Sequence, residues 1–143
     1  MKKKGFQLLA AAIFAAIALM LLSVQRSSSE LFYFQNQSEL HAAALQILHS
    51  GSSSDISVSG VARIHDWHGT NPIIEFTISS FGLTPSSQYK GLYYSPNDVP
   101  AAFQNTQQTL IKTKDGWTWT DEHANHGNTT RIDLCWYTFE AYF

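Results

Sequence analysis

The hydrophobic and polar positions along this chain change their period twice. Residues 6–24 form an apolar run that is interrupted only by Gln7 and Ser23 and contains no charge. From Glu30 to His49 the apolar side chains recur at helical spacing, and from Ile56 onward apolar and polar residues alternate as they do in strands. The pattern therefore predicts an apolar helix, an amphipathic helix and a β-rich region, in that order.

The apolar run has the length of a membrane-spanning helix. At a rise of ~1.5 Å per residue it would extend about 28 Å, which is close to the ~30 Å thickness of the bilayer hydrocarbon. Lys2, Lys3 and Lys4 precede it, and positive charge stays on the cytoplasmic side. We therefore expect residues 1–26 to be an N-terminal membrane anchor, or uncleaved signal, with the rest of the chain outside the cytoplasm. A signal peptide cleaved after Ser29 is the alternative.

A second helix is predicted from Glu30 to His49. Ser29 is a suitable N-cap, and Gly51 follows the end of the helix. One face carries an apolar stripe, formed by Leu40, Ala44, Ile47 and Leu48. Because the next residues are rich in serine and glycine, residues 27–55 are expected to be a juxtamembrane helix and a flexible linker.

Residues 56–143 are expected to form an extracytoplasmic β-rich domain. The alternation of apolar and polar side chains predicts strands at Ile74–Ile78, with Glu75 on the solvent side, and at Tyr89–Tyr94. Asp115-Gly116 lies between two short strand-like stretches and indicates a hairpin. The chain is predicted to close with one long strand from Arg131 to Phe143.

Two further segments are predicted to be turns, and one residue limits how the domain is stabilised. The turns are His65–Pro72 and Gly82–Pro85. Cys135 is the single cysteine, so an intrachain disulfide is impossible and packing alone must hold the domain together. Inside the predicted closing strand, this thiol is expected to be a small buried hydrophobe.

These elements predict the α+β fold class. After an N-terminal transmembrane helix, the amphipathic helix is expected to pack on a small antiparallel β-sheet, which would bury the apolar stripe and one face of the sheet together. A small β-sandwich with a stalk helix is the alternative.

The charge of the exported part argues against two classes of partner. From Ser27 onward, five basic residues stand against eleven acidic ones, which gives a net charge of −6 with neutral histidines. A domain of this sign is unsuited to nucleic acid and to charge-driven adsorption on anionic lipid. We therefore expect no nucleic-acid partner.

The sequence motif H-x-x-H-G occurs twice, at His65–Gly69 and at His123–Gly127. Imidazole is a common ligand of zinc and of other transition metals. A shared site would require both predicted turns to lie at the same end of the sheet, and this spacing on a loop has no fixed geometry. No cofactor is expected to be required, and a transition-metal site is the alternative, with four candidate ligands: His65, His68, His123 and His126.

Aromatic side chains are abundant after residue 56. Adjacent rings such as Tyr93 and Tyr94 must point to opposite faces of a strand, so some of them are directed away from a one-sided core. Exposed rings bordered by polar side chains suit a sugar or a protein partner. The ligand-contact candidates are Tyr93, Trp117 and Trp119. In the alternative, the helix covers one face of the sheet, loops cover the other, and the rings belong to the core.

Motifs of the common enzyme classes are absent from the sequence. There is no G-x-S-x-G elbow, H-E-x-x-H pair, Walker A loop or G-x-G-x-x-G turn. Carboxylates such as Asp98, Asp121 and Glu122 form no pair that can be assigned as acid and base. The chain is therefore not expected to be an enzyme, and no catalytic residue is predicted.

The start of the chain resembles that of the type IV prepilins. The residues that carry the resemblance are Lys2-Lys3-Lys4-Gly5-Phe6, followed at once by the apolar run and later by a β-domain, and it covers about the first fifty residues. It implies a peptidase cut between Gly5 and Phe6 and packing of the N-terminal helix into a filament core. Two features depart from that family: its glutamate, fifth in the mature chain, is Ala10 here, and its frequent C-terminal disulfide cannot form.

Together these patterns predict a single-pass bacterial membrane protein with a cytoplasmic N-terminus. Its extracytoplasmic domain is expected to be a non-enzymatic binding or structural module of unknown ligand. The expected partners are the lipid bilayer, through the N-terminal helix, and a protein or glycan at the cell surface. A type IV pilin-like filament subunit and a histidine-based metal-binding domain are the alternatives.

Overall fold

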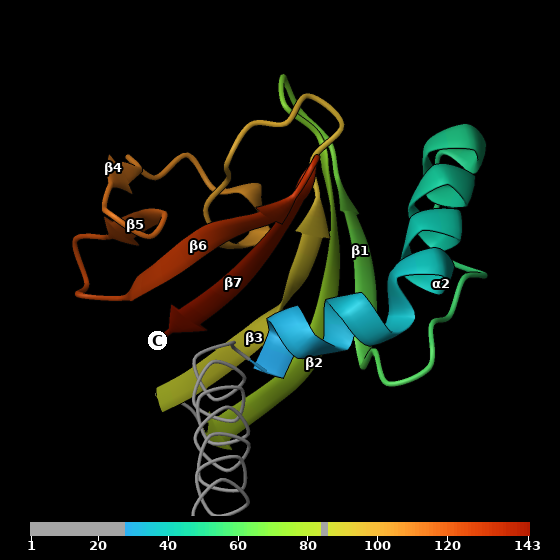
Figure 1. Cartoon of the computed structure of the whole chain (residues 1–143). Coiled ribbons are helices and arrows are strands. Elements are labelled where there is room, and N and C mark those ends of the chain that lie inside the picture. The colour runs from blue at the N-terminus through green and yellow to red at the C-terminus, as the bar shows by residue number, and fades with distance from the viewer. Residues whose placement is uncertain (1–27, 84–85) are drawn as a thin grey trace, which may run out of the picture.

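The computed structural model describes residues 28–83 and 86–143 (Figure 1). Within these ranges an α-helix packs on a seven-stranded antiparallel sheet, which confirms the predicted helix-on-sheet α+β arrangement. No helix in these two ranges is long and apolar enough to cross a membrane. The predicted transmembrane segment, residues 6–24, lies outside the described residues.

Helix α2 spans Ser28–Ser50, close to the predicted bounds. It ends where Gly51 takes a φ of 71° and donates its N–H to the Ile47 carbonyl at 2.8 Å. Asn36 has non-helical backbone angles, and its side-chain amide donates to the Phe32 carbonyl at 2.9 Å. This kink divides the helix into a first half that lies across the strands and a second half that runs along them (Figure 1).

The sheet is a single layer with the order β1-β2-β3-β7-β6-β5-β4. The short 3₁₀ helix η1 (Phe103–Asn105) lies in the long connection between β3 and β4. Because β7 inserts between β3 and β6, the C-terminal strand occupies the centre of the sheet. The strands are β1 (Arg63–Trp67), β2 (Ile73–Leu83), β3 (Ser86–Tyr94), β4 (Ile111–Lys112), β5 (Trp117–Thr120), β6 (His126–Asp133) and β7 (Trp136–Tyr142).

The predicted closing strand from Arg131 to Phe143 was wrong. Asp133 pairs with Trp136, so the chain reverses at Leu134 and Cys135 and forms the β6–β7 hairpin. Cys135 is a turn residue with a φ of 64° and not a buried strand residue. The turn was missed because it contains none of the glycines or asparagines that usually mark a two-residue hairpin.

Two predicted turns were also partly wrong. His65 lies within β1, and β2 continues through Gly82 to Leu83. In both places the backbone pairs with a neighbouring strand: His65 with Glu75, and Gly82 with Ser87. In both places the strands of a local hairpin extend into the predicted turn, so the turn itself is shorter than predicted.

The first half of the core lies between α2 and the sheet. Trp136 is its centre: the ring of Tyr33 lies 5.2 Å from it and that of Phe76 lies 5.7 Å from it, centroid to centroid. The Tyr33 hydroxyl also donates to Asp133 Oδ2 at 2.8 Å, which ties the helix to the end of β6. The buried members are Tyr33, Leu40, Ala43, Ala44, Ile47, Val58, Ile74, Phe76, Leu92 and Trp136.

The second half of the core lies on the opposite face of the sheet. The connection between β3 and β4, including η1, packs over this face, so both faces are covered and no β-sandwich is needed. Glu75 and Thr77 are buried for the same reason, and the prediction of a solvent side at Glu75 was wrong. The buried members are Ile73, Tyr93, Ala101, Ala102, Phe103, Trp119, Tyr137, Phe139 and Ala141.

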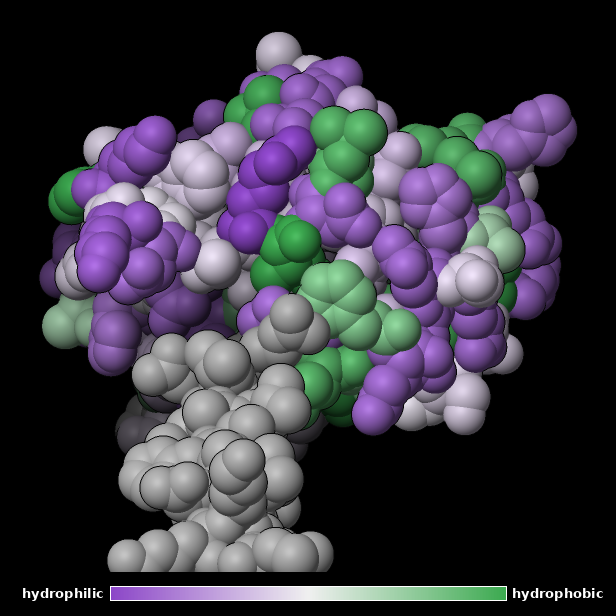
Figure 2. Space-filling model, in the orientation of Figure 1, coloured by the Kyte–Doolittle hydropathy of each residue, from purple (hydrophilic) through white to green (hydrophobic). Residues whose placement is uncertain are grey.

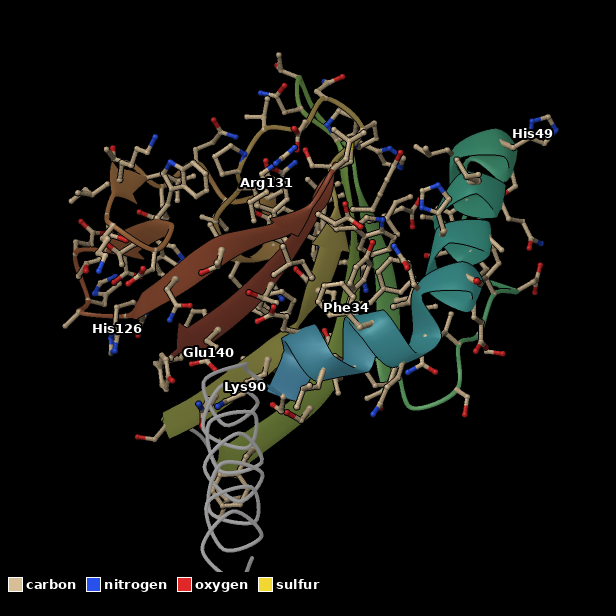
Figure 3. The ribbon with its side chains drawn as sticks, viewed as in Figure 1. Phe34, His49, Lys90, His126, Arg131 and Glu140 are labelled. Atoms are coloured by element: carbon tan, nitrogen blue, oxygen red, sulfur yellow. The ribbon has the colours of Figure 1, made fainter. Side chains whose placement is uncertain are left out.

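The two ends of the sheet carry different segments. The β1–β2 end holds residues 68–72, 95–100 and the β6–β7 turn, and α2 finishes there. The β2–β3 end holds Leu83, Ser86, residues 121–125 and Phe143. The start of α2 lies toward the β2–β3 end, and His49 lies at the other end (Figures 1 and 3). The chain therefore enters the described fold near one end, and α2 carries it to the other.

Candidate functional site

Tyr93, the first ligand-contact candidate, lies in the core beneath the β3–β4 connection. Its side chain is only 2% exposed, and its ring stacks on Tyr137 at 5.0 Å with parallel planes. The hydroxyl accepts the Ala101 N–H at 2.9 Å and lies 2.6 Å from Thr129 Oγ1. Because the Thr129 hydroxyl donates its hydrogen to the Thr138 carbonyl, Tyr93 is the donor to Thr129. This network joins the connection to the sheet.

The two tryptophan candidates are also directed toward the covered face. Trp119 is buried and packs against Phe143 and Gly127. Trp117 is half-buried, and the Lys112 ammonium lies 5.9 Å from the centre of its ring, within the range of a cation–π contact. The three candidates thus share one face of the sheet, but that face belongs to the core and only Trp117 reaches its rim.

Asp98 holds this covering layer in place. Its carboxylate accepts two hydrogen bonds from the Arg131 guanidinium, at 2.9 and 2.6 Å, and one from the Cys135 N–H at 3.0 Å. The Tyr137 hydroxyl donates to it at 3.0 Å. The pKa of Asp98 is lowered to about 2, and the hydrogen bonding from Arg131 contributes most to this shift. Burial, followed by the contact with Asp98, raises the pKa of Tyr137 to about 12.

Glu75 is a buried carboxylate that sequence reasoning missed. It accepts the Gln104 N–H at 3.1 Å and the Thr77 hydroxyl at 3.3 Å, and so fixes η1 on the sheet. Burial raises its pKa above the ordinary range of a glutamate. The Trp67 indole N–H is buried without a hydrogen-bond partner among the described residues. It points toward Glu75, and its proximity slightly lowers the pKa of that carboxyl. No local sequence signal distinguishes Glu75 from an ordinary solvent-facing strand residue.

The two H-x-x-H-G motifs lie at opposite ends of the sheet. Trp67, within the first motif, pairs with Ile73 at the β1–β2 end. His126 pairs with Tyr142 and stacks on its ring at 5.0 Å at the β2–β3 end. His65, His68, His123 and His126 therefore do not converge, and the described residues contain no group of three or more potential metal-binding side chains.

The first motif borders a pocket of about 290 Å³ at the β1–β2 end. The apolar part of its lining includes Ile47, Ile73 and Pro96. The residues of the first motif that line it are Asp66, Trp67 and His68. His68 Nε2 lies 3.3 Å from Asp66 Oδ2, and the Ser53 hydroxyl donates to Asp66 Oδ1 at 2.6 Å. The pKa of Asp66 is lowered, and the hydrogen bond from the Ser53 hydroxyl contributes most to this shift.

A second pocket, of about 230 Å³, adjoins the same turn on the other face of the sheet. The Asn105 side-chain amide donates to the Asn71 carbonyl at 3.0 Å, and that of Asn97 donates to Asn71 Oδ1 at 3.3 Å. No charged side chain contributes to its lining within the described ranges. The polar members of that lining are Thr70, Asn71, Asn105, Thr106, Gln107 and Gln108.

The described residues also border two larger hollows, of about 530 and 590 Å³, elsewhere on the fold. Figure 2 shows one face as mainly hydrophilic, with apolar residues in small separate groups. The turn at residues 68–72 is flanked by an apolar pocket with an Asp–His pair and by an uncharged polar pocket. We name this surface the turn-68 site, formed by the two pockets and the turn between them. Such a combination of apolar wall and converging polar groups is typical of small ligand sites.

Comparison with known proteins adds no relative. The chain matches no family model, and searches of the curated proteins and of the solved structures find no significant match.

The Asp98 contacts predict a pH dependence of stability. Because the pKa of Asp98 is lower in the folded chain than the ordinary 3.8, its contribution is complete above about pH 4 and is lost as the pH falls toward 2. Asp98→Asn should lower the free energy of unfolding at pH 7 by about 1–3 kcal/mol and should reduce its fall between pH 4 and pH 2. Urea unfolding followed by tryptophan fluorescence at several pH values measures both effects.

The exposed Glu122→Gln provides the control for this prediction. It should change the free energy of unfolding by less than about 0.5 kcal/mol at pH 7. Asp66, Asp121 and Asp133 also have lowered pKa values, so the comparison uses the difference between wild type and variant. Identical pH profiles for wild type and Asp98→Asn would rule out the proposed role of this carboxylate.

Proposed function

We propose that this protein is a single-pass membrane protein whose described part is an extracytoplasmic, non-enzymatic binding module. Its ligand surface is the turn-68 site. The observation that carries the proposal is the separation of the two ends of the fold. The chain enters α2 toward the β2–β3 end, directly after the apolar sequence, while both pockets of the turn-68 site lie at the β1–β2 end.

Sequence and orientation support the membrane part of this proposal together. Residues 6–24 have the length and composition of a transmembrane helix, and three lysines precede them. With the anchor preceding Ser28, the β1–β2 end is the end farther from the bilayer. A ligand outside the cell then meets the turn-68 site first.

The use of the ionisable groups supports a binding role over a catalytic one. Groups with shifted pKa values are frequent at catalytic sites, but structural networks shift them as well. Here the Asp98 carboxylate accepts hydrogen bonds from Arg131, and that of Asp133 accepts one from the Tyr33 hydroxyl. The Glu75 carboxylate accepts the N–H of Gln104 in η1. Each of these carboxylates is thus engaged by groups that hold the fold together.

The chemistry of the turn-68 site favours a neutral polar ligand, and we propose a glycan. Amide and hydroxyl side chains that pair with sugar hydroxyls line one pocket, and the other combines apolar side chains with the Asp66–His68 pair. The net charge of −6 on the exported part disfavours strongly acidic ligands.

The membrane part of the proposal predicts a mass and a labelling pattern. Protein recovered from the native membrane fraction should have the full-length mass, with at most the initiator methionine lost. A membrane-impermeant maleimide added to intact cells should label a Leu134→Cys, Cys135→Ser variant, because position 134 is exposed at the β1–β2 end. The mass of a chain that begins near residue 30, or labelling only after the cells are broken, would contradict the anchored topology.

A type IV pilin-like subunit is the second candidate. The observation in its favour is that α2 follows the apolar sequence and precedes a β-domain, the order of elements that carries the resemblance of the N-terminus. The same mass measurement separates the two candidates. Loss of residues 1–5 alone, by a cut between Gly5 and Phe6, would make filament assembly the leading function.

If the turn-68 site binds a glycan, the first H-x-x-H-G motif should contribute to binding and the second should not. His68→Ala should weaken the binding of neutral oligosaccharides to the full chain in nanodiscs, because His68 borders the turn-68 site. The matched control is His123→Ala, since His123 is about equally exposed and belongs to the duplicate motif at the other end of the sheet. A glycan array followed by titration of the best oligosaccharide measures the effect. Equal loss in both variants, or no binding by the wild type, would contradict a glycan site here.

A further inference from the structure

The β2–β3 hairpin extends beyond β1, and its last pair, Leu83 with Ser86, also lies beyond the end of β7. Pairing of β1 with β2 stops at Arg63 and Thr77, so residues 79–83 of β2 pair only with β3 among the described strands. At the end of this extension Phe81 is 83% exposed and Leu83 is 86% exposed. These are the most exposed of the large apolar side chains in the described ranges. We name Phe81 and Leu83 the hairpin tip.

A β-bulge places both tip side chains on the face that carries α2. The register of β2 against β3 shifts between Thr77 and Ser79, which adds one residue to β2 at that point. Because side chains alternate between faces, this shift reverses the direction of every following side chain. Phe81 is thereby opposite Gln88 and shares an open apolar hollow with Tyr142 and Phe143.

The extended part of the hairpin carries no charged residue. Between Glu75 and Lys90 the sequence contains no acidic and no basic residue. Lys90, at the base of the extension, is paired with Glu140 at 3.1 Å. In a domain with a net charge of −6, an uncharged apolar projection of this kind is suited to a neutral surface and not to a charged partner.

The position of the tip relative to the start of α2 indicates what that surface is. Ser29 and Glu30 border the same hollow as Glu140, next to Lys90 (Figure 3). From Lys90 the strand β3 runs four residues outward to Ser86, about 13 Å at ~3.3 Å per residue.

The linker to the apolar run has a matching length. Val24, its last residue, precedes Ser28 by four residues, which span at most about 14 Å. The two lengths are about equal, so even a fully extended linker leaves the hairpin tip within reach of the bilayer.

We infer that the hairpin tip is a second membrane contact, in which Phe81 and Leu83 enter the interfacial zone of the lipid bilayer. The inference rests on the proposed membrane anchor. Aromatic and leucine side chains are favoured at this depth. The unpaired edge of β2 limits insertion to the hydrated interface, because backbone groups in the hydrocarbon need partners. The contact fixes the tilt of the domain, so that the turn-68 site is directed away from the membrane.

Two leucines in comparable positions allow a controlled test. Leu83 and Leu134 are both highly exposed and both lie at a hairpin, but at opposite ends of the sheet. In the full chain with Cys135→Ser, Leu83→Cys or Leu134→Cys is labelled with the fluorophore nitrobenzoxadiazole and reconstituted in phosphatidylcholine vesicles. Flotation of the vesicles reports the anchor, and quenching by nitroxide-bearing lipid reports the contact. Phe81→Cys is a second label position should Leu83→Cys fold poorly.

The expected result is a blue-shifted emission from the label at position 83. Its fluorescence should be quenched more strongly by a nitroxide near the lipid headgroup than by one at the chain end, and high salt should not reverse the quenching. The label at position 134 should show neither effect.

A vesicle-bound chain whose label at position 83 is unquenched would overturn the hairpin contact alone. A blue shift without quenching would also overturn it, because protein would then cover the tip. A chain that does not float with the vesicles would overturn the anchor and this inference together.

Discussion

The central strands carry large side chains on both faces, and the chain has no disulfide with which to stabilise a partly open core. Tyr93 and Tyr94 point to opposite faces of β3, as do Trp136 and Tyr137 on β7. Both faces must therefore be covered by the chain itself. The kinked helix α2 covers one, and the β3–β4 connection covers the other. This connection crosses the whole face because β4 runs in the same direction as β3, so the chain has to return from the β1–β2 end to the other end.

A covering layer without regular strand pairing needs other attachments, and polar side chains supply them. The Tyr93 hydroxyl receives the Ala101 N–H, and the Glu75 carboxylate receives the Gln104 N–H. Asp98 joins the start of the connection to Arg131 and to the β6–β7 turn. Buried backbone groups that leave water must find such partners, and here they find them on the sheet. The same attachments shape the turn-68 site, because the connection forms one wall of its polar pocket.

Much of the fold could be predicted from periodicity, since α2, β3, β5 and the β4–β5 hairpin are local patterns. The β6–β7 turn could not, because Leu134 and Cys135 continue an apolar alternation and the contact of Asp98 with the turn is long-range. The candidate site was harder to predict for a similar reason. Whether the two H-x-x-H-G motifs meet depends on strand order, and the insertion of β7 beside β3 is not encoded in any local spacing. The burial of Tyr93 and Trp119 likewise follows from the path of the connection, although a sheet covered on both faces was one of the two predicted arrangements.

The β3–β4 connection is thus a structural layer of the fold and not a surface loop. Hydrogen exchange at single amides of the full chain tests it most directly. The amides of Ala101 and Gln104 should exchange nearly as slowly as that of Leu92 in the central strand β3, because all three open only when the fold opens. If Ala101 and Gln104 instead exchange as fast as the exposed Lys114 in the β4–β5 turn, the connection opens independently of the sheet and is a surface loop after all.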